Sequence, residues 1–187
     1  EATRRRDVFY EGFSAKGAAE GEPTGKDVVL AMGQAITDET HLLVDGGNIG
    51  QWFHMLMHDR YPARWVTCGR SGVVGWGVPS AAAVSSLNPG RRVLLLSGDG
   101  ASTFTIAEIE NAVRQNLPYV AVIADDCAWG IVVSGSNRRD QPAVGSKLGS
   151  IKFDEVARGF GARGVRVDDI SLLPGEVEKG FDSKQVT

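Results

Sequence analysis

The sequence is poor in the residues on which several classes of protein depend. Its two cysteines, Cys68 and Cys127, have no metal-ligand spacing and form no disulfide framework, so each is interpreted as a reduced thiol. No apolar run approaches the roughly 20 residues that a membrane span needs, and no signal-peptide pattern is present. The 20 Lys and Arg residues are outnumbered by 23 Asp and Glu residues and form no extended basic block. We therefore expect a cytoplasmic protein that binds neither nucleic acid nor a membrane.

Histidine is scarce as well, with three copies at His41, His54 and His58. The last two are four positions apart, the spacing at which two zinc ligands share one face of a helix. Neither a third ligand nor a glutamate accompanies them in that pattern, so a surface or core position is expected for both. No catalytic residue is assigned in this chain.

Helix-like and strand-like patterns alternate along the chain, which favours an α/β protein with helices on both faces of a parallel sheet. Strands are expected at 41–44, 65–67, 93–97, 119–124 and 165–167. Helices are expected at 26–37, 52–58, 78–87, 104–116, 153–161 and 172–180. The pattern predicts a doubly wound, three-layer, Rossmann-like α/β domain over residues 26–187. The charged, glycine-rich residues 1–25 are expected to be a linker or irregular tail.

The most informative segment follows the apolar run at 93–97. Gly98, Asp99 and Gly100 come directly after this strand and open a helix-like run, where close backbone approach and free N–H groups favour a phosphate. Asp99 supplies a hard oxygen of the kind that Mg²⁺ prefers. Asp126 stands 27 positions later, at the end of the next strand. Because a right-handed crossover brings both carboxylates to one edge of a parallel sheet, the spacing predicts a metal-bridged diphosphate site.

Four segments together resemble the C-terminal diphosphate-binding (PP) domain of thiamine diphosphate enzymes. Residues 98–130 are similar to the family motif that runs from Gly-Asp-Gly to Asn-Asn, and they read GDGASTFTIAEIENAVRQNLPYVAVIADDCAWG. Three further segments agree, namely LLVDGGNIGQW at 42–52, GRSGVVGWGVPSAAA at 69–83 and FDEVARGFGARGVRV at 153–167. The resemblance is strongest to the branch of acetolactate synthase, oxalyl-CoA decarboxylase and benzoylformate decarboxylase. It covers about residues 25–170 and implies the thiamine diphosphate-binding fold, in a domain shortened at its C-terminal end.

The resemblance also implies roles for individual residues. Mg²⁺ would be bound by the side chains of Asp99 and Asp126 and by the carbonyl of Ala128. The aminopyrimidine ring would be held by the Gly72 carbonyl and the Val74 N–H, with the Val74 side chain as the wedge that bends the cofactor. The remaining cofactor contacts would lie along the diphosphate and its edge, at Gly47, Asn48, Ile49, Gly98, Gly100, Ala101, Ser102, Trp129, Gly130 and Ile131.

Two positions depart from the family pattern. Asp125 and Asp126 replace the paired asparagines, which adds negative charge beside a diphosphate unless a metal neutralises it. Val74 is smaller than the Met, Ile or Leu that is usual for the wedge. The first departure leads to the hypothesis that the cofactor is lost more steeply on chelation or acidification.

By this resemblance the chain would bind thiamine diphosphate and Mg²⁺ within an enzyme, a lyase or transferase, that decarboxylates or ligates 2-oxo acids. A pyrimidine-binding domain of the same or another chain would complete the site, so this chain alone would be inactive, and the enzyme would be a homo-oligomer. Two alternatives remain open, a separate small subunit of a split 2-oxo acid decarboxylase and a non-catalytic diphosphate-binding homologue. A nicotinamide dehydrogenase is disfavoured because DGGNIG at 45–50 lacks the G-x-G-x-x-G pattern.

Overall fold

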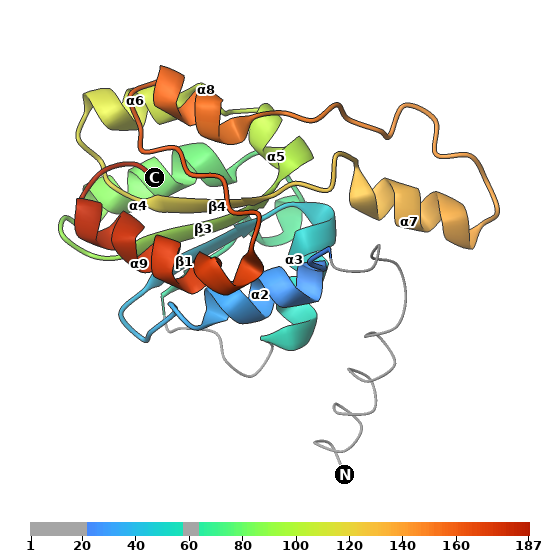
Figure 1. Cartoon of the computed structure of the whole chain (residues 1–187), viewed down its shortest axis with the longest axis horizontal. Helices are drawn as coiled ribbons and strands as arrows, with labels where there is room; N and C mark the ends of the chain where they lie inside the picture. The colour runs from blue at the N-terminus through green and yellow to red at the C-terminus, as the bar shows by residue number, and fades with distance from the viewer. Residues whose placement is uncertain (1–21, 58–63) are drawn as a thin grey trace, which may run out of the picture.

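A wholly parallel four-stranded sheet forms the centre of the molecule (Figure 1). The computed structural model describes residues 22–57 and 64–187, so most of the expected linker, as well as His58, lies outside the described residues. The strands are β1 (His41–Asp45), β2 (Trp65–Val66), β3 (Val93–Gly98) and β4 (Val120–Ala124), in the order β2-β1-β3-β4. The predicted α/β class and its parallel sheet are confirmed.

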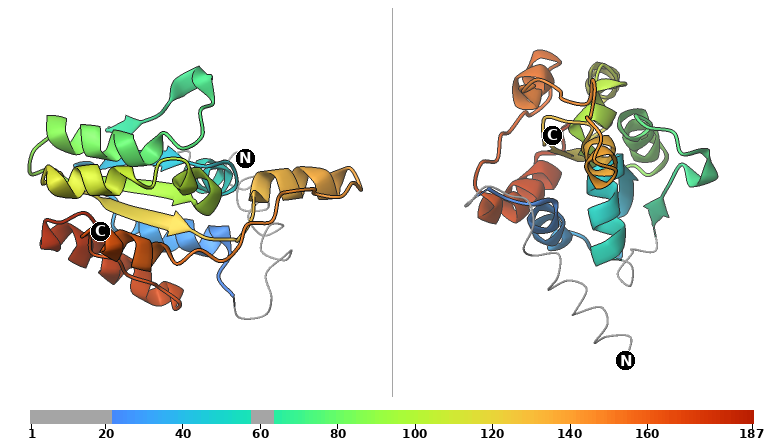
Figure 2. Two further views of the ribbon diagram at one scale, coloured as in Figure 1. Left: turned by 90° about the horizontal axis from the view of Figure 1, so that it is seen from above. Right: turned by 90° about the vertical axis from the view of Figure 1, so that its right-hand side faces the viewer.

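Helices cover both faces of the sheet and give three layers (Figure 2). One face carries α2 (Gly25–Gly33), α3 (Gly47–Leu56) and α9 (Leu173–Ser183). The other carries α4 (Gly77–Leu87), α6 (Glu108–Arg114) and α8 (Phe153–Gly159). The short elements are α5 (Asp99–Thr103), η1 (Gly69–Ser71) and η2 (Ile170–Leu172), while α7 (Gly130–Arg138) projects to one side of the sheet in Figure 1. Within the two described ranges, no helix combines the length and apolar character that crossing a membrane requires.

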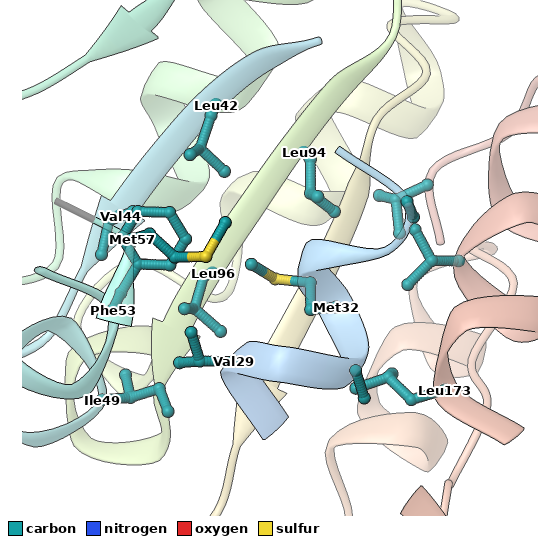
Figure 3. Close-up of a cluster of buried hydrophobic side chains, with 14 residues drawn as sticks. Val29, Met32, Leu42, Val44, Ile49, Phe53, Met57, Leu94, Leu96 and Leu173 are labelled. Carbon is teal, nitrogen blue, oxygen red and sulfur yellow. The ribbon is translucent and has the colours of Figure 1, made fainter. Parts of the chain in front are cut away.

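The apolar strands build two cores because successive side chains of a strand point to opposite faces. In β3, Leu94 and Leu96 pack against Val29 and Met32 of α2 (Figure 3). Val93 and Leu95 point the other way, into a second cluster with α4 and α6. These four consecutive apolar residues are at most 1% exposed, as expected of a central strand covered on both faces.

The prediction of one helix over 104–116 is wrong for the first half of that range. The structure has a short α5, then turns over 104–107, and α6 begins only at Glu108. The hydroxyl of Thr105 donates to the carbonyl of Gly75 at 2.8 Å, and the backbone N–H groups of Phe104 and Thr105 bond three residues back rather than four. Side-chain hydrogen bonds of this kind compete with a regular helix, so a distant loop interrupts the helix here.

The strand predicted at 165–167 is also absent, and no described strand includes these residues. Beside β4, the N–H of Thr187 donates to the Tyr119 carbonyl at 2.9 Å and its carbonyl accepts from Ala121 N–H at 2.8 Å. Arg163 N–H donates to the carbonyl of Val186 at 2.8 Å. The C-terminal residues thus lie between β4 and Arg163, which comes just before the expected strand. The helix expected at 52–58 is a smaller correction, because α3 already begins at Gly47.

The sheet topology brings the ends of three strands together. The pairing register places Asp45 of β1 beside Ser97 of β3, and Gly98 of β3 beside Ala124 of β4. The chain leaves β1 toward β2 on one side and returns to β3 on the other, so β1 and β3 flank the point where the strand order reverses. In open α/β sheets, ligands bind at such a point, outside the carboxyl ends of the strands.

Candidate functional site

A cavity of about 840 Å³ opens at this edge and continues along β4. Its lining includes the loop after β1, the turn after β3 and the segment after β4. Most of the residues singled out in the sequence line it, namely Gly47, Asn48, Ile49, Val74, Gly98, Asp99, Gly100, Ala101, Asp126, Ala128, Trp129, Gly130 and Ile131. Two do not, Gly72 and Ser102. The predicted residues that line the cavity therefore come from four segments that are far apart in the sequence.

Asp99 is the most deeply buried carboxylate on this side of the cavity, with 4% of the residue exposed. Its Oδ1 accepts from the N–H of Gly100 at 2.7 Å, and its Oδ2 accepts from the N–H of Ala128 at 3.1 Å. Burial, together with the nearby carboxylates of Asp126 and Asp125, raises the pKa of Asp99 to about 6, although the hydrogen bond from Gly100 N–H opposes the rise. Asp99 thus links the turn after β3 to the segment after β4.

Asp126 lies on the opposite side of this carboxylate cluster and is exposed. Its Oδ2 accepts from the side-chain amide of Asn48 at 2.8 Å, which connects it to the first turn of α3. Neighbouring Asp125 accepts from the N–H of Cys127 at 2.9 Å, in a turn where Cys127 has a φ of 52°. The residue expected to give a backbone oxygen, Ala128, is thus adjacent to both predicted carboxylate ligands.

The charge of this cluster is suited to a hard cation. Three aspartates, Asp99, Asp125 and Asp126, lie close enough for their charges to interact, and no ion pair among the described residues joins any of them to a basic side chain. The described parts of the chain contain no group of three His, Cys, Asp or Glu side chains that would hold a metal alone. A Mg²⁺ ion here would therefore take ligands from two carboxylates, a backbone carbonyl and the oxygens of its substrate or cofactor, which is the usual way that Mg²⁺ is bound.

Glycines keep the walls of the site close together. A Cβ on Gly100 would lie 2.8 Å from the ring of Trp129, and one on Gly47 would lie 2.6 Å from Cγ2 of Ile131. A Cβ on Gly130 would overlap the Asp126 carboxylate and the Asn48 amide. These contacts explain why three of the predicted cofactor positions carry no side chain.

Ser102 lies behind the turn rather than on its surface. The residue is fully buried, and its hydroxyl donates to the hydroxyl of Ser97 at 3.0 Å. The Ser102 side chain therefore ties α5 to β3. Its hydroxyl hydrogen is already used inside the protein, which leaves the backbone groups of Gly98, Gly100 and Ala101 as the part of the turn that faces the cavity.

The glycine-rich loop at 69–77 forms a different side of the site. Gly72 has a φ of 62° and no atom within 4 Å of a Cβ placed on it, so it stands in open space. Val74 is 43% exposed and lines the cavity. Beyond it, Gly75 and Gly77 are buried. The loop is thus exposed at its tip and buried in its second half.

Asp45 fixes that second half and was missed in the sequence. Its Oδ1 accepts from Gly75 N–H at 3.2 Å and its Oδ2 from Gly77 N–H at 2.8 Å. Burial raises the pKa of Asp45 above its ordinary value, although both of these amide hydrogen bonds oppose that rise. An acidic residue at the last position of a buried strand, directly before two glycines, was the available signal, but its partners lie 30 or more residues away.

The two described histidines, His41 and His54, lie outside this arrangement. His54 is on α3, and its ring contacts that of Trp65 edge-on at a centroid distance of 5.8 Å. Burial lowers the pKa of His54, which favours the neutral ring. His41 begins β1, at the opposite end of the strand from Asp45. Neither lines the cavity.

Known proteins resemble this chain in sequence and in fold. Residues 45–187 match the family described as thiamine pyrophosphate enzyme, C-terminal TPP binding domain. Human 2-hydroxyacyl-CoA lyase 2 is 29% identical over 170 residues, which cover 88% of this chain and 26% of the human protein. Acetolactate synthase from Bacillus subtilis is 25% identical over 158 residues, which cover 84% of this chain and 28% of the relative.

The fold also matches a solved structure, that of benzoylformate decarboxylase from Polynucleobacter necessarius. The TM-score is 0.80 at 20% identity, and the match covers 92% of this chain and 33% of that one. This chain thus spans about a quarter to a third of the length of the proteins it matches. With the family match over residues 45–187, the chain belongs to the C-terminal thiamine pyrophosphate-binding domains of thiamine pyrophosphate enzymes.

Proposed function

We propose that this chain binds the diphosphate of thiamine diphosphate through Mg²⁺ at the carboxyl edge of its sheet. The ion would be held by Asp99, Asp126 and the carbonyl of Ala128. The observation that carries this proposal is the cluster of three aspartates that no ion pair among the described residues joins to a basic side chain. A buried carboxylate with a raised pKa beside two like charges is stabilised in its ionised form by a bound cation.

The walls of the cavity support a phosphate between this cluster and the turn after β3. Gly98, Gly100 and Ala101 line it with backbone, and Asn48 presents a side-chain amide from the first turn of α3. Glycine at these positions lets a ligand approach the backbone closely. Trp129, Gly130 and Ile131 close the same side of the cavity.

The whole enzyme would act on small 2-oxo acids, by decarboxylation or carboligation. When bound, thiamine diphosphate supplies a nucleophilic carbon and takes up the electrons released on C–C cleavage. This chain would orient that cofactor at both ends, while a pyrimidine-binding domain of the same or another chain completes the site. Because no catalytic residue is assigned here, we expect the chain alone to bind cofactor without turning over substrate. The enzyme would be a cytoplasmic homo-oligomer.

A calorimetric titration tests the proposal. Thiamine diphosphate is added to the full chain in Mg²⁺ and then in EDTA. We expect binding that requires the metal and that excess inorganic pyrophosphate displaces, because the diphosphate provides the shared contacts. Binding that is unchanged in EDTA would contradict the metal role, and no binding at millimolar cofactor would contradict the diphosphate site in this chain.

A second candidate is a non-catalytic protein that binds a diphosphate for regulation. The additional carboxylate of Asp125 and the small side chain of Val74 are the observations that favour it. The two candidates differ in their selectivity for the ring of the ligand. A site for thiamine diphosphate must bind thiamine diphosphate more tightly than a nucleoside diphosphate. Competition between these two ligands for the chain in Mg²⁺ separates the candidates.

A further inference from the structure

The carboxylate of Asp45 joins β1 to a loop that begins far along the chain. The residue is 2% exposed, and each of its two oxygens accepts a backbone N–H, from Gly75 at 3.2 Å and from Gly77 at 2.8 Å. A buried carboxylate is costly unless it is hydrogen-bonded. Both of its oxygens are therefore committed to holding one short stretch of backbone.

The same stretch is held from its other side. The hydroxyl of Thr105 donates to the carbonyl of Gly75 at 2.8 Å, so both peptide groups of this glycine are bonded to side chains. Gly75 has a φ of 85°, and a Cβ there would lie 2.5 Å from Cβ of Phe104. The ring of Phe104 in turn lies 5.7 Å from that of Trp129, centre to centre. Gly75 is thus fixed between the end of β1 and the turns that follow α5.

Val74 is the residue directly before this fixed point. Its side chain is 43% exposed and lines the cavity, whereas its neighbour Val73 is 53% exposed and does not line it. Gly72, two residues before Val74, is exposed, and a Cβ placed on it would meet no atom within 4 Å. The Sγ of Cys68 also donates to the Val73 carbonyl at 3.8 Å, but that contact is exposed, so the anchors at Gly75 are the more deeply buried restraints beside Val74.

We propose that Asp45 is a positioning residue that, with Thr105, holds Val74 against the ring end of the cofactor. The inference rests on the proposed function, because it assigns this end of the cavity to the ring and the aspartate cluster to the diphosphate. The inference therefore predicts different effects on the binding of the ring and on the binding of the diphosphate. Loss of the Asp45 anchor weakens contact with the ring and leaves the diphosphate contacts intact.

A simpler structural role must be distinguished from this one. Gly77 is the first residue of α4, whose N-cap Trp76 makes no side-chain hydrogen bond, so Asp45 also satisfies a free N–H at the start of that helix. If helix capping were its whole role, Asp45→Asn would lower stability without separating the two ligands. Thr105 bonds Gly75 and not α4, and therefore tests the anchor independently of the cap.

The test compares Mg²⁺-thiamine diphosphate with Mg²⁺-pyrophosphate as ligands of the full chain, by calorimetry. For Asp45→Asn and for Thr105→Val we expect about 10-fold weaker binding of thiamine diphosphate, about 1.4 kcal/mol, and unchanged binding of pyrophosphate. Thr105→Ser keeps the hydroxyl and should bind both ligands as the wild type does. Asp169→Asn removes another carboxylate that accepts a backbone N–H, in η2, and should change neither affinity.

The outcomes separate this inference from the proposed function. A wild-type chain that binds neither ligand contradicts the proposed function and the inference with it. A wild-type chain that binds both, with variants that lose both equally or lose neither, contradicts the inference alone. Equal binding of the two ligands by the wild type would also contradict the inference alone, because the ring would then add nothing to the affinity.

Hydrogen exchange gives a readout that needs no ligand. In the wild type the amides of Gly75 and Gly77 should be protected, because both donate to a buried carboxylate. Asn can accept from only one of them, so Asp45→Asn should speed exchange within 72–77 while α6 stays protected. Unchanged exchange in this segment would overturn the proposal, as would loss of protection throughout the chain.

Discussion

The two ends of the candidate site are built in different ways. At the end proposed to hold the diphosphate, Asp99 follows directly on β3 and Asp126 is the second residue after β4, and the pairing of those strands brings them together. At the ring end, the Val74 loop has an exposed tip, and its position comes from Asp45 and Thr105 on other segments. One end is set by sheet register and the other by side-chain hydrogen bonds.

This difference has consequences for strength and for tolerance to change. Sheet register is supported by a continuous ladder, so the diphosphate end has few ways to move, and its glycines are already in contact with side chains across the cavity. The ring end depends on three hydrogen bonds to two glycines. We therefore expect substitutions at the diphosphate end to change the binding of both thiamine diphosphate and pyrophosphate, and substitutions at the ring end to change the binding of thiamine diphosphate alone.

The largest effect is expected for Asp99→Ala, which removes the diphosphate end. Loss of a direct ligand should weaken Mg²⁺-thiamine diphosphate binding by about 100-fold or more, the upper range for residues that support a metal site. Pyrophosphate binding should be lost in parallel, because both ligands use the same metal. Calorimetry with the two ligands checks this. If the Asp99→Ala chain still bound pyrophosphate, Asp99 would not be a ligand of the metal.

Gly130→Ala tests how closely the diphosphate end is built. The added Cβ would overlap the Asp126 carboxylate and the Asn48 amide, so we expect roughly 10-fold weaker binding of both ligands, as for other residues that orient a metal ligand. Gly135→Ala, in the same helix, is the matched control, because its Cβ meets only the Arg139 side chain at 3.7 Å. Equal effects of the two substitutions would indicate a change in the helix rather than in the site.

The pH dependence of stability tests the charge of the aspartate cluster. Since the folded-state pKa of Asp99 is raised to about 6, its contribution to the free energy of unfolding is full below about pH 4 and is lost as the pH rises through 6. In EDTA, urea unfolding should therefore show the wild type losing stability relative to Asp99→Asn between pH 4 and 7. With Mg²⁺ the loss should shrink, because the ion stabilises the carboxylate. An equal difference between the two chains at pH 4 and at pH 7 would mean that the pKa of Asp99 is not raised in the folded chain.

Asp126→Asn restores an amide where the family motif has one and should have a smaller effect. A second carboxylate beside a diphosphate depends on the metal for neutralisation, so the wild type should release cofactor at lower EDTA concentration, and at higher pH during acidification, than the variant. A chelator titration followed by the bound fraction of thiamine diphosphate measures this. Equal sensitivity of the two chains would contradict the role given to Asp126.

The smallest effect is expected at the ring end, for Val74→Ile. A larger side chain should fill more of the cavity and tighten thiamine diphosphate binding a few-fold, about 0.8 kcal/mol for one buried methylene, without changing pyrophosphate binding. Val73→Ile, at the exposed neighbour outside the cavity, is the control. If both substitutions tighten binding equally, Val74 has no specific contact with the ring.

The sequence predicted the fold class and the convergence of the diphosphate end because both follow from local rules. Apolar runs such as 93–97 identify buried strands, and parallel register then carries Asp99 and Asp126 to one edge. The hydrogen bonds that hold the ring end could not be predicted from a local rule. Nothing in the spacing of Asp45 and Gly75 indicates a hydrogen bond between them, since that bond depends on how the loop crosses the sheet.

The incorrect predictions have the same origin. The apolar periodicity of 104–116 fits a helix, but the Thr105 bond to Gly75 and the packing of Phe104 interrupt it. The alternating residues at 165–167 fit a strand, but Thr187 takes the hydrogen bonds of β4 near residue 120. In each case a tertiary contact, which short-range patterns do not encode, decided the local structure.

A crystal structure of the full chain with Mg²⁺ and thiamine diphosphate tests the account most directly. It should show the ion bound between Asp99, Asp126 and the Ala128 carbonyl, the diphosphate against the turn after β3, and the ring beside Val74. A metal bound away from Asp99, or a diphosphate bound elsewhere in the cavity, would contradict the account.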